Sequence, residues 1–253
     1  MRIENTIKVE VCAFSLESCL TAQSAGASRI ELCSGLYEGG TTPSFGLISE
    51  VRKHIEIELF VMIRPRGGDF LYSQSELKVM ATDIEFAKKA GANGIVVGLL
   101  LENGKVDLHK TKEIVERANP MKVTFHRAID VTPDPFEALE SIIEAGCIRV
   151  LTSGQKNKAI DGLDTLGFLV EKAQNRIEIM AGAGLNIDNV DFFIQKGVNA
   201  VHLTGKVARQ SAMTYRNSLV SMSDFDQIPE FDIIYTDFQK IRDLVDKVNS
   251  YKY

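Results

Sequence analysis

The chain has 253 residues, of which 45% are hydrophobic and 25% charged, as is typical of a globular protein with a sizeable core. Its formal net charge of −5 gives no electrostatic case for binding nucleic acid, and no apolar run approaches the roughly 20 residues of a membrane span. The N-terminus has no apolar stretch followed by a small-residue cleavage site, so we expect no signal peptide. We therefore expect a cytoplasmic protein whose four cysteines are reduced.

Eight short apolar runs bounded by turn residues are predicted to be strands. Most are rich in Val, Ile and Leu, as expected of strands that are covered on both faces. In chain order they are Val9–Cys12, Ile30–Cys33, Leu59–Ile63, Gly94–Val97, Lys122–Phe125, Arg149–Leu151, Glu178–Ala181 and Ala200–Leu203.

Helical patterns fill the gaps between these runs. Four of them end at a glycine that leads directly into a strand, namely Gly26, Gly91, Gly146 and Gly197. The expected helix starts are Ser15 as the N-cap of Leu16–Ala25, a capping box from Ser73 to Glu76, Asp134 followed by Pro135, Asn186 before a helix through Lys196, and Thr236 or Asp237 for the last helix. A helix-to-strand join that recurs along the chain predicts βα units and a parallel sheet.

Eight strands alternating with helices predict an α/β fold of the closed (β/α)8 TIM-barrel type, with one domain spanning residues 1–253. A doubly wound open sheet is the alternative, but no Gly-x-Gly-x-x-Gly follows the first strand. The stretch Lys206–Phe231 is long for a connection and has no clear period. We interpret it as a lid, an oligomer contact or a partly disordered loop.

Two of the predicted strands repeat one pattern of an apolar residue, glutamate, an apolar residue and cysteine. The first strand carries Glu10 and Cys12, and the second carries Glu31 and Cys33. If the strands are parallel neighbours, we expect Glu10 beside Glu31 and Cys12 beside Cys33. Burying two carboxylates together costs free energy unless they are paired or protonated, so this arrangement favours a working site.

Ionisable residues lie where several strands of a barrel would point into one mouth. The candidates for acid–base chemistry are Glu10, Glu31, His126 and His202. The alternative is that the two glutamates form a structural ion network with Arg64 and Arg127.

An anion-binding role is predicted for a second group of residues. Arg64 and Arg66 flank Pro65 and precede two glycines, which offers guanidinium groups and backbone N–H groups to a phosphate or carboxylate. Loops after the seventh and eighth strands add Gly182, Gly184, Thr204 and Gly205. The alternative is that the arginines tie down a rigid turn and the glycines serve tight turns.

Cys12 and Cys33 are candidate metal ligands, because both lie at the carboxyl ends of adjacent predicted strands. Two thiolates that reach one soft ion suit Cu(I). Two ligands are a sparse set, however, and the dense spacings of most metal sites are absent. Cys19 and Cys147 are expected to be packing residues.

The sequence resembles the CutC copper homeostasis family from about Val9 to Gly205. The resemblance is carried by Glu10-Val11-Cys12, Arg29-Ile30-Glu31-Leu32-Cys33, Gly39-Gly40-Thr41-Thr42-Pro43-Ser44, Met62-Ile63-Arg64-Pro65-Arg66-Gly67-Gly68-Asp69-Phe70 and Thr124-Phe125-His126-Arg127-Ala128. It implies a cytoplasmic barrel linked to copper handling, with Cys12 and Cys33 as Cu(I) ligands, and a homodimer or higher homo-oligomer.

Two functions are therefore expected. The first is a copper homeostasis protein that binds Cu(I) through two cysteines at the barrel mouth. The second is a barrel enzyme that uses acid–base chemistry on a small phosphorylated or carboxylated metabolite.

Overall fold

Eight parallel strands form a closed barrel in which each strand pairs with the next and β8 returns to pair with β1. The computed structural model describes residues 7–217, 219–220 and 230–251. The barrel strands are β1 Lys8–Ala13, β2 Arg29–Leu32, β3 Glu58–Met62, β4 Gly94–Val97, β5 Lys122–Phe125, β6 Arg149–Thr152, β7 Glu178–Gly182 and β8 Ala200–Leu203. The predicted (β/α)8 TIM barrel is confirmed.

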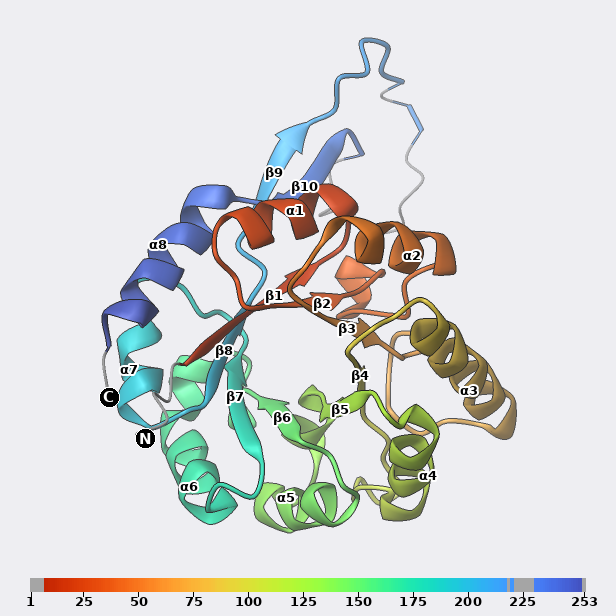
Figure 1. Ribbon diagram of the computed structural model, residues 1–253, viewed down its shortest axis with the longest axis vertical. Helices are drawn as coiled ribbons and strands as arrows, with labels where there is room; N and C mark the ends of the chain where they lie inside the picture. Colours follow the sequence, from red (N-terminus) through yellow and green to blue (C-terminus); the bar gives the residue numbers. More distant parts are fainter. Residues whose placement is uncertain (1–6, 218, 221–229, 252–253) are drawn as a thin grey trace.

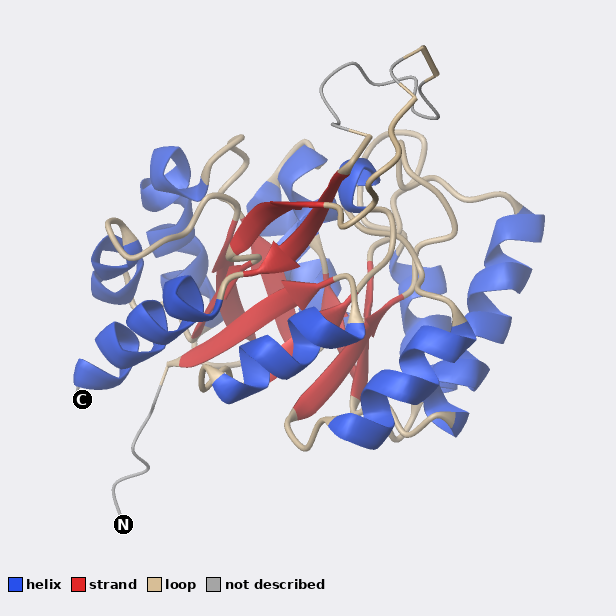
Figure 2. Ribbon diagram, turned by 90° about the horizontal axis from the view of Figure 1, so that it is seen from above, coloured by secondary structure: helices blue, strands red, loops and turns tan. Residues whose placement is uncertain are grey.

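Helices surround the ring of strands, so that the sheet forms the inner layer and the helices the outer one (Figures 1 and 2). The α-helices are α1 Leu16–Ser24, α2 Phe45–His54, α3 Gln74–Lys89, α4 Leu108–Ala118, α5 Pro135–Glu144, α6 Leu163–Ala173, α7 Val190–Gln195 and α8 Phe238–Ser250. Three short 3-10 helices are η1 Leu36–Glu38, η2 Arg127–Val131 and η3 Ala159–Gly162. Among the residues with described positions, no helix has the length and apolar character to cross a membrane.

The helix ends follow local sequence signals. Caps are confirmed at Ser15, Asp134 and Asp237, and both bonds of the capping box from Ser73 to Glu76 are present. The four helix-ending glycines have φ values of 94°, 86°, 89° and 80°, the left-handed conformation expected of them. The cap at Asn186 was wrong, because the amide of Asn186 donates to Oδ1 of Asn189 in a turn and α7 begins only afterwards.

Alternation along each strand separates two apolar regions. Ile30 and Leu32 on β2 belong to the large core between the strands and the helices. Cys33, which follows β2, packs instead with Cys12 and Phe60 in a smaller cluster inside the barrel. The inner face therefore carries sulfur and charge, while the outer face supplies most of the apolar core.

The predicted register of the first two strands was wrong by two residues. Glu10 lies opposite Arg29, and Cys12 lies opposite Glu31. Closing a barrel requires each strand to be staggered against its neighbour, and here Glu31 pairs two residues further along β1 than Glu10. The stagger also brings the buried guanidinium of Arg29 onto the Glu10 carboxylate.

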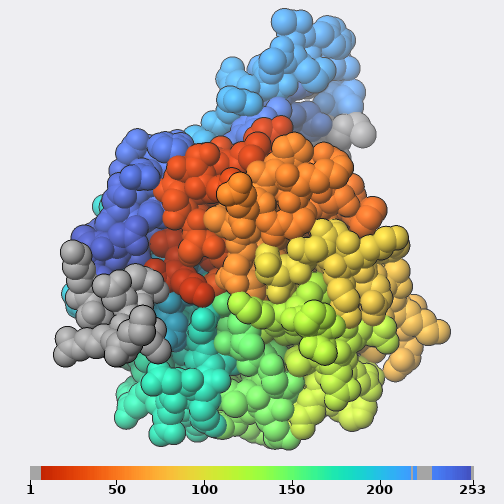
Figure 3. All heavy atoms as spheres, viewed as in Figure 1, coloured from red at the N-terminus to blue at the C-terminus, as the bar shows by residue number. Residues whose placement is uncertain are grey.

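A short antiparallel pair follows the barrel, formed by β9 Lys206–Gln210 and β10 Asp232–Thr236. It lies on the rim beside α1, where the Thr236 amide donates to Ser18 Oγ at 3.2 Å. Residues 211–217, which follow β9, project beyond the body of the barrel (Figure 3). The sequence pattern had not predicted β9, and residues 218 and 221–229 of this stretch lie outside the described residues.

Candidate functional site

A pocket of about 480 Å³ lies at the carboxyl end of the barrel strands. The sequence-predicted residues that line it are Cys12, Glu31, Arg64, His126, His202, Gly184, Thr204 and Gly205. Glu10 and Cys33 lie directly behind this lining and contact His202 and Cys12 respectively. Arg66 and Gly182 do not line the pocket.

The two predicted thiol ligands converge. The Sγ atoms of Cys12 and Cys33 are 3.7 Å apart, and the Cys33 Sγ lies 3.5 Å from Oε2 of Glu31. The hydrogen bond with Cys33, opposed by burial and assisted by His202, lowers the pKa of Cys12 to about 6. Burial and the neighbouring Cys12 raise the pKa of the Cys33 thiol well above its usual range. Cys12 thus has the lower thiol pKa of the pair.

His202 joins the two predicted carboxylates. Its Nδ1 lies 2.8 Å from Glu10 Oε1, and its Nε2 lies 3.8 Å from Glu31 Oε2. Burial lowers the pKa of His202, but Glu31, Cys12 and Glu10 together raise it well above the usual range. His202 thus links both carboxylates to the thiol side of the pocket.

The two glutamates differ because their surroundings differ. Burial raises the pKa of Glu10, yet the charge of Arg29 and the hydrogen bond with His202 outweigh it and lower the pKa to about 2. Burial and the nearby Cys12 raise the pKa of Glu31 well above its usual range. The two carboxyl groups thus differ in pKa, with that of Glu10 lowered and that of Glu31 raised. Such a difference is typical of carboxyl groups that have different roles.

Two buried arginines below this site were missing from the predicted set. Arg29 pairs with Glu10, and Arg149 donates to Glu178 at 2.6 Å and to Thr124 Oγ1 at 3.0 Å. Both guanidinium groups lie over the ring of Phe60 at 5.3 and 4.9 Å from its centre. Strand alternation placed Arg29 on the same face as Glu31, which was the signal that could have revealed it.

The expected ion network of the glutamates with Arg64 and Arg127 was wrong. The Nη atoms of Arg64 donate to three backbone carbonyls, those of Glu38 at 2.6 Å, Gly40 at 2.9 Å and Gly68 at 2.8 Å. Arg64 therefore holds two loops together, in agreement with the alternative that it stabilises a rigid turn. Arg127 pairs with Asp130 at 2.8 Å.

Arg66 lies on the outer side of its loop. It pairs with Glu76 at 2.5 Å and Asp69 at 2.9 Å. The ion pairs hold the loop to the start of α3, so the Arg66 guanidinium faces carboxylates of the chain rather than the pocket.

His126 is buried on the pocket wall opposite the thiols, because it follows β5 and β5 lies across the ring from β1. Its Nδ1 accepts a hydrogen bond from the Ala128 amide at 3.1 Å. Burial, with further contributions from Arg64 and Arg127, lowers its pKa to about 3. A neutral imidazole with a proton on Nε2 follows from this arrangement.

The glycines after β7 and β8 have packing reasons for their identity. A Cβ on Gly182 would lie 2.6 Å from Leu151 Cδ1, and one on Gly205 would lie 2.5 Å from Ile241 Cδ1. Gly184 has a φ of 78°, and its carbonyl accepts a hydrogen bond from Asn189 Nδ2 at 2.9 Å. Tight packing thus accounts for Gly182 and Gly205, and the left-handed backbone accounts for Gly184, without requiring an anion.

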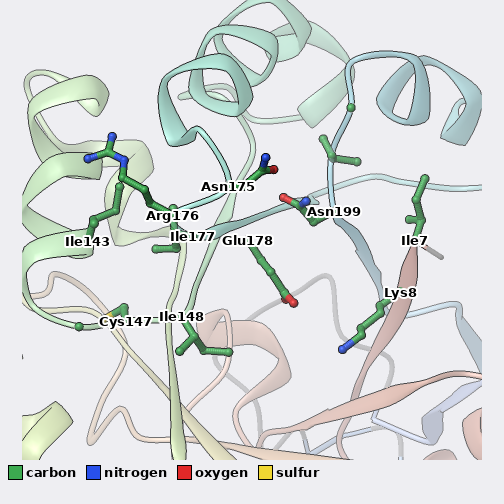
Figure 4. A pocket seen from close by; sticks show the side chains of 13 residues that line it. Ile7, Lys8, Ile143, Cys147, Ile148, Asn175, Arg176, Ile177, Glu178 and Asn199 are labelled. Carbon is green, nitrogen blue, oxygen red and sulfur yellow. The ribbon is translucent and has the colours of Figure 1, made fainter. Parts of the chain in front are cut away.

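A second hollow of about 830 Å³ lies at the opposite, amino end of the strands. Figure 4 shows Lys8 at the start of β1 and Glu178 at the start of β7 extending into it. None of the predicted site residues line this hollow. Cys147, which was expected to be a packing residue, is part of its lining. The chemistry-bearing residues gather at the carboxyl end instead.

Comparison with known proteins agrees with this barrel. The family model described as the CutC family matches residues 7–207. The chain belongs to the CutC family. A copper homeostasis protein cutC homolog of Homo sapiens is 44% identical over 241 residues, which cover 95% of this chain and 88% of that protein. A CutC family protein of Bacteroides fragilis is 44% identical over 95% of this chain and 97% of its own length.

Solved structures extend the comparison to the fold. A crystal structure of CutC from Streptococcus agalactiae superposes with a TM-score of 0.74 at 36% identity, covering 78% of this chain and 97% of that one. Thiamine phosphate pyrophosphorylase from Pyrococcus furiosus superposes with a TM-score of 0.59 at 15% identity over 97% of both chains, which shows a shared barrel and nothing further. The predicted CutC family membership is thus confirmed.

Proposed function

We propose that this chain acts in copper homeostasis by binding Cu(I) through the thiolates of Cys12 and Cys33. The observation that carries the proposal is the 3.7 Å between their Sγ atoms. Two metal–sulfur bonds of about 2.3 Å span up to roughly 4.6 Å, so both sulfurs can reach one ion from where they lie. Thiolates are the soft ligands that favour Cu(I).

The surroundings of the two thiols support the same proposal. Glu31 lies within 4.8 Å of both sulfur atoms, which places a carboxylate oxygen beside the pair. Cys12 faces the pocket and Cys33 is fully buried behind it, so an ion enters from the Cys12 side. The names of the human and mouse relatives also link the family to copper homeostasis.

Titration of reduced protein with Cu(I) against a competing chelator tests this proposal. We expect tight binding that is lost in a Cys12→Ser/Cys33→Ser variant. The matched control is Cys19→Ala/Cys147→Ala, since these two buried thiols lie outside the site and their removal should leave copper stoichiometry unchanged. Equal affinity of the Cys12→Ser/Cys33→Ser variant and the unmodified protein would overturn the proposal.

A second function is favoured by the pocket itself, whose 480 Å³ is far more than one ion with two sulfur ligands requires. We propose as the alternative that the barrel is an enzyme acting on a small anionic metabolite. Glu31 and His202 line the pocket and would exchange protons with the substrate, while Glu10 would orient His202 from behind. Pockets of this size commonly hold metabolites.

A thermal-shift screen of small anionic metabolites tests the second function, because any true ligand stabilises the fold by mass action. A hit is then followed for turnover in the unmodified protein and in Glu31→Gln, with Glu140→Gln on the surface as the matched control. Turnover that survives Glu31→Gln unchanged would remove Glu31 from the chemistry, and an absence of any stabilising anion would remove the function.

We further propose a homodimer or higher homo-oligomer in the cytoplasm, supported by the family resemblance. Light scattering coupled to size-exclusion chromatography measures the assembly directly, and a monomer mass of 28.0 kDa at all concentrations would contradict it. Fractionation of the source cells measures the location.

A further inference from the structure

Arg64 differs from the other deeply buried arginines of the barrel. Arg29 and Arg149 each contact a glutamate, but Arg64, only 5% exposed, forms no ion pair with any described residue. Its Nη atoms donate to neutral backbone carbonyls, and the neighbouring Tyr72 hydroxyl, whose pKa burial raises to about 12, is neutral as well. A buried charge without a counter-charge costs free energy. A negatively charged ligand could supply the counter-charge that the surroundings of Arg64 lack.

Two N–H donors on this wall have no partner. Nε of Arg64 and Nε2 of His126 are buried and make no hydrogen bond within the described chain. Because Nδ1 of His126 accepts the Ala128 amide, the proton of the neutral ring is on Nε2. Unpaired buried donors of this kind are rare in folded proteins and call for a partner.

The two donors belong to one wall of the pocket, and one aromatic ring covers both. The Phe70 ring centre lies 4.9 Å from that of His126 and 5.1 Å from Cζ of Arg64. Phe70 itself is partly exposed, lines the same pocket and follows Gly67 and Gly68 in its loop. A ligand that reaches the donors would therefore displace part of the Phe70 ring.

We propose that this wall binds the carboxylate group of a small organic acid, whose oxygens accept hydrogen bonds from His126 Nε2 and Arg64 Nε. The inference rests on the second function above and narrows its ligand from anions in general to carboxylates. Two free N–H groups match the two oxygens of a carboxylate, whereas phosphate carries more charge and a third oxygen. Three of the four Arg64 Nη hydrogens, which a phosphate would use, are already bound to carbonyls.

The rest of the acid would then face the opposite wall. Cys12, Glu31 and His202 are the penultimate residues of β1, β2 and β8, which lie across the ring from β5 and its His126. A carboxylate held at His126 directs the neighbouring carbon or hydroxyl of the acid toward these groups. This geometry places the polar end and the reactive end of the ligand on separate walls.

The test uses pyruvate and lactate as carboxylate probes, with pyruvamide as the uncharged isostere and inorganic phosphate as the other anion. Protein labelled with ¹⁵N at histidine is titrated to about 50 mM probe, which saturates a site with a Kd of ~1 mM. We expect a carboxylate probe, and neither pyruvamide nor phosphate, to shift the His126 Nε2 signal saturably. His126→Phe, which keeps a ring against Phe70, should weaken binding about tenfold or more.

His109→Phe is the matched control, because His109 is exposed on α4 and its loss should leave affinity unchanged. Arg64→Gln provides a second variant that should also weaken the carboxylate. Saturable phosphate binding without carboxylate binding would overturn this inference and leave the anion-binding enzyme standing. Carboxylate binding that is equal in His126→Phe, or failure of every probe to bind, would overturn it as well, and the latter would also count against the second function.

Discussion

The Sγ atoms of Cys12 and Cys33 lie 3.7 Å apart although the two cysteines are not partners in the β1–β2 ladder. Cys12 is opposite Glu31, and Cys33 follows the last residue of β2, where its amide donates to the Ala13 carbonyl at 3.0 Å. The thiols thus meet on a diagonal, which depends both on the barrel stagger and on the chain's path after β2. Glu31 is opposite Cys12 and two residues before Cys33, so its carboxyl group lies beside both thiols.

Alkylation of Cys12 should depend on pH in an unusual way. The hydrogen bond with Cys33, with help from His202, outweighs burial and lowers the Cys12 pKa to about 6. The thiolate fraction therefore reaches half near pH 6, well below the pH of about 8.5 for a free cysteine. We expect the rate of iodoacetamide labelling, followed by peptide mass spectrometry, to level off by about pH 7.

Replacing Cys33, the hydrogen-bond partner of Cys12, checks that prediction. In Cys33→Ala the labelling midpoint of Cys12 should move up toward the ordinary cysteine value, because the thiolate loses its partner. Cys147→Ala, which removes a thiol elsewhere in the core, should leave it unchanged. A midpoint that does not respond to Cys33→Ala would contradict the assigned cause.

Glu10→Gln should be strongly destabilising. The substitution removes the buried charged partner of the Arg29 guanidinium and leaves it only the longer contact with Glu58 Oε2 at 3.7 Å. Breaking a buried pair in this way costs about 3–5 kcal/mol, and chemical denaturation at pH 7 measures it. Glu140→Gln, which breaks an exposed pair with Arg176, should cost about 1 kcal/mol or less. Equal losses in the two variants would contradict the structural role of Glu10.

Acid should unfold the protein partly through Glu10. Its pKa is lowered from 4.5 to about 2 on folding, so its stabilising contribution is complete above pH 4.5 and is lost as the pH falls toward 2. The shift corresponds to about 3 kcal/mol. The unfolding free energy of Glu10→Gln should therefore fall less steeply than that of the unmodified protein over this range, and parallel curves would show that another group dominates.

Gly98, which follows β4, should not tolerate a side chain. A Cβ there would lie 2.2 Å from Cε1 of His126 and 2.8 Å from Cβ of Ala128, so Gly98→Ala must push the imidazole away. Overpacking of this kind costs about 1–3 kcal/mol, measured by denaturation. Gly46→Ala in α2 is the control, because the nearest atom is Ser44 Oγ at 3.9 Å and the helix gains from alanine. A neutral Gly98→Ala would show that the ring moves freely.

The sequence indicated the barrel well because its signals are local and periodic. The strand runs, the helix-ending glycines and the caps at Ser15 and Asp134 each depend on only a few neighbouring residues. The convergence of Cys12 with Cys33 also follows once two adjacent strands are assumed to be parallel. These features required no knowledge of how distant loops fold.

The remaining features of the site depend on relationships that no local pattern contains. The stagger that pairs Glu10 with Arg29 is a property of ring closure. The use of Arg64 to hold three carbonyls depends on two loops meeting in space, and a motif of arginine and glycine fits both that role and a ligand role. Side-chain type alone therefore indicated which residues gather but not which of them remain available.

The stacked layer of Arg29, Phe60 and Arg149 has a consequence for traffic through the molecule. All three side chains are essentially inaccessible to solvent, and together they fill the barrel axis beneath the thiols. Among the described residues, this layer separates the pocket at the carboxyl end from the hollow at the amino end. An ion or metabolite that enters past Cys12 therefore leaves at the carboxyl end of the strands as well, so the loops at that end set the rates of both its binding and its release.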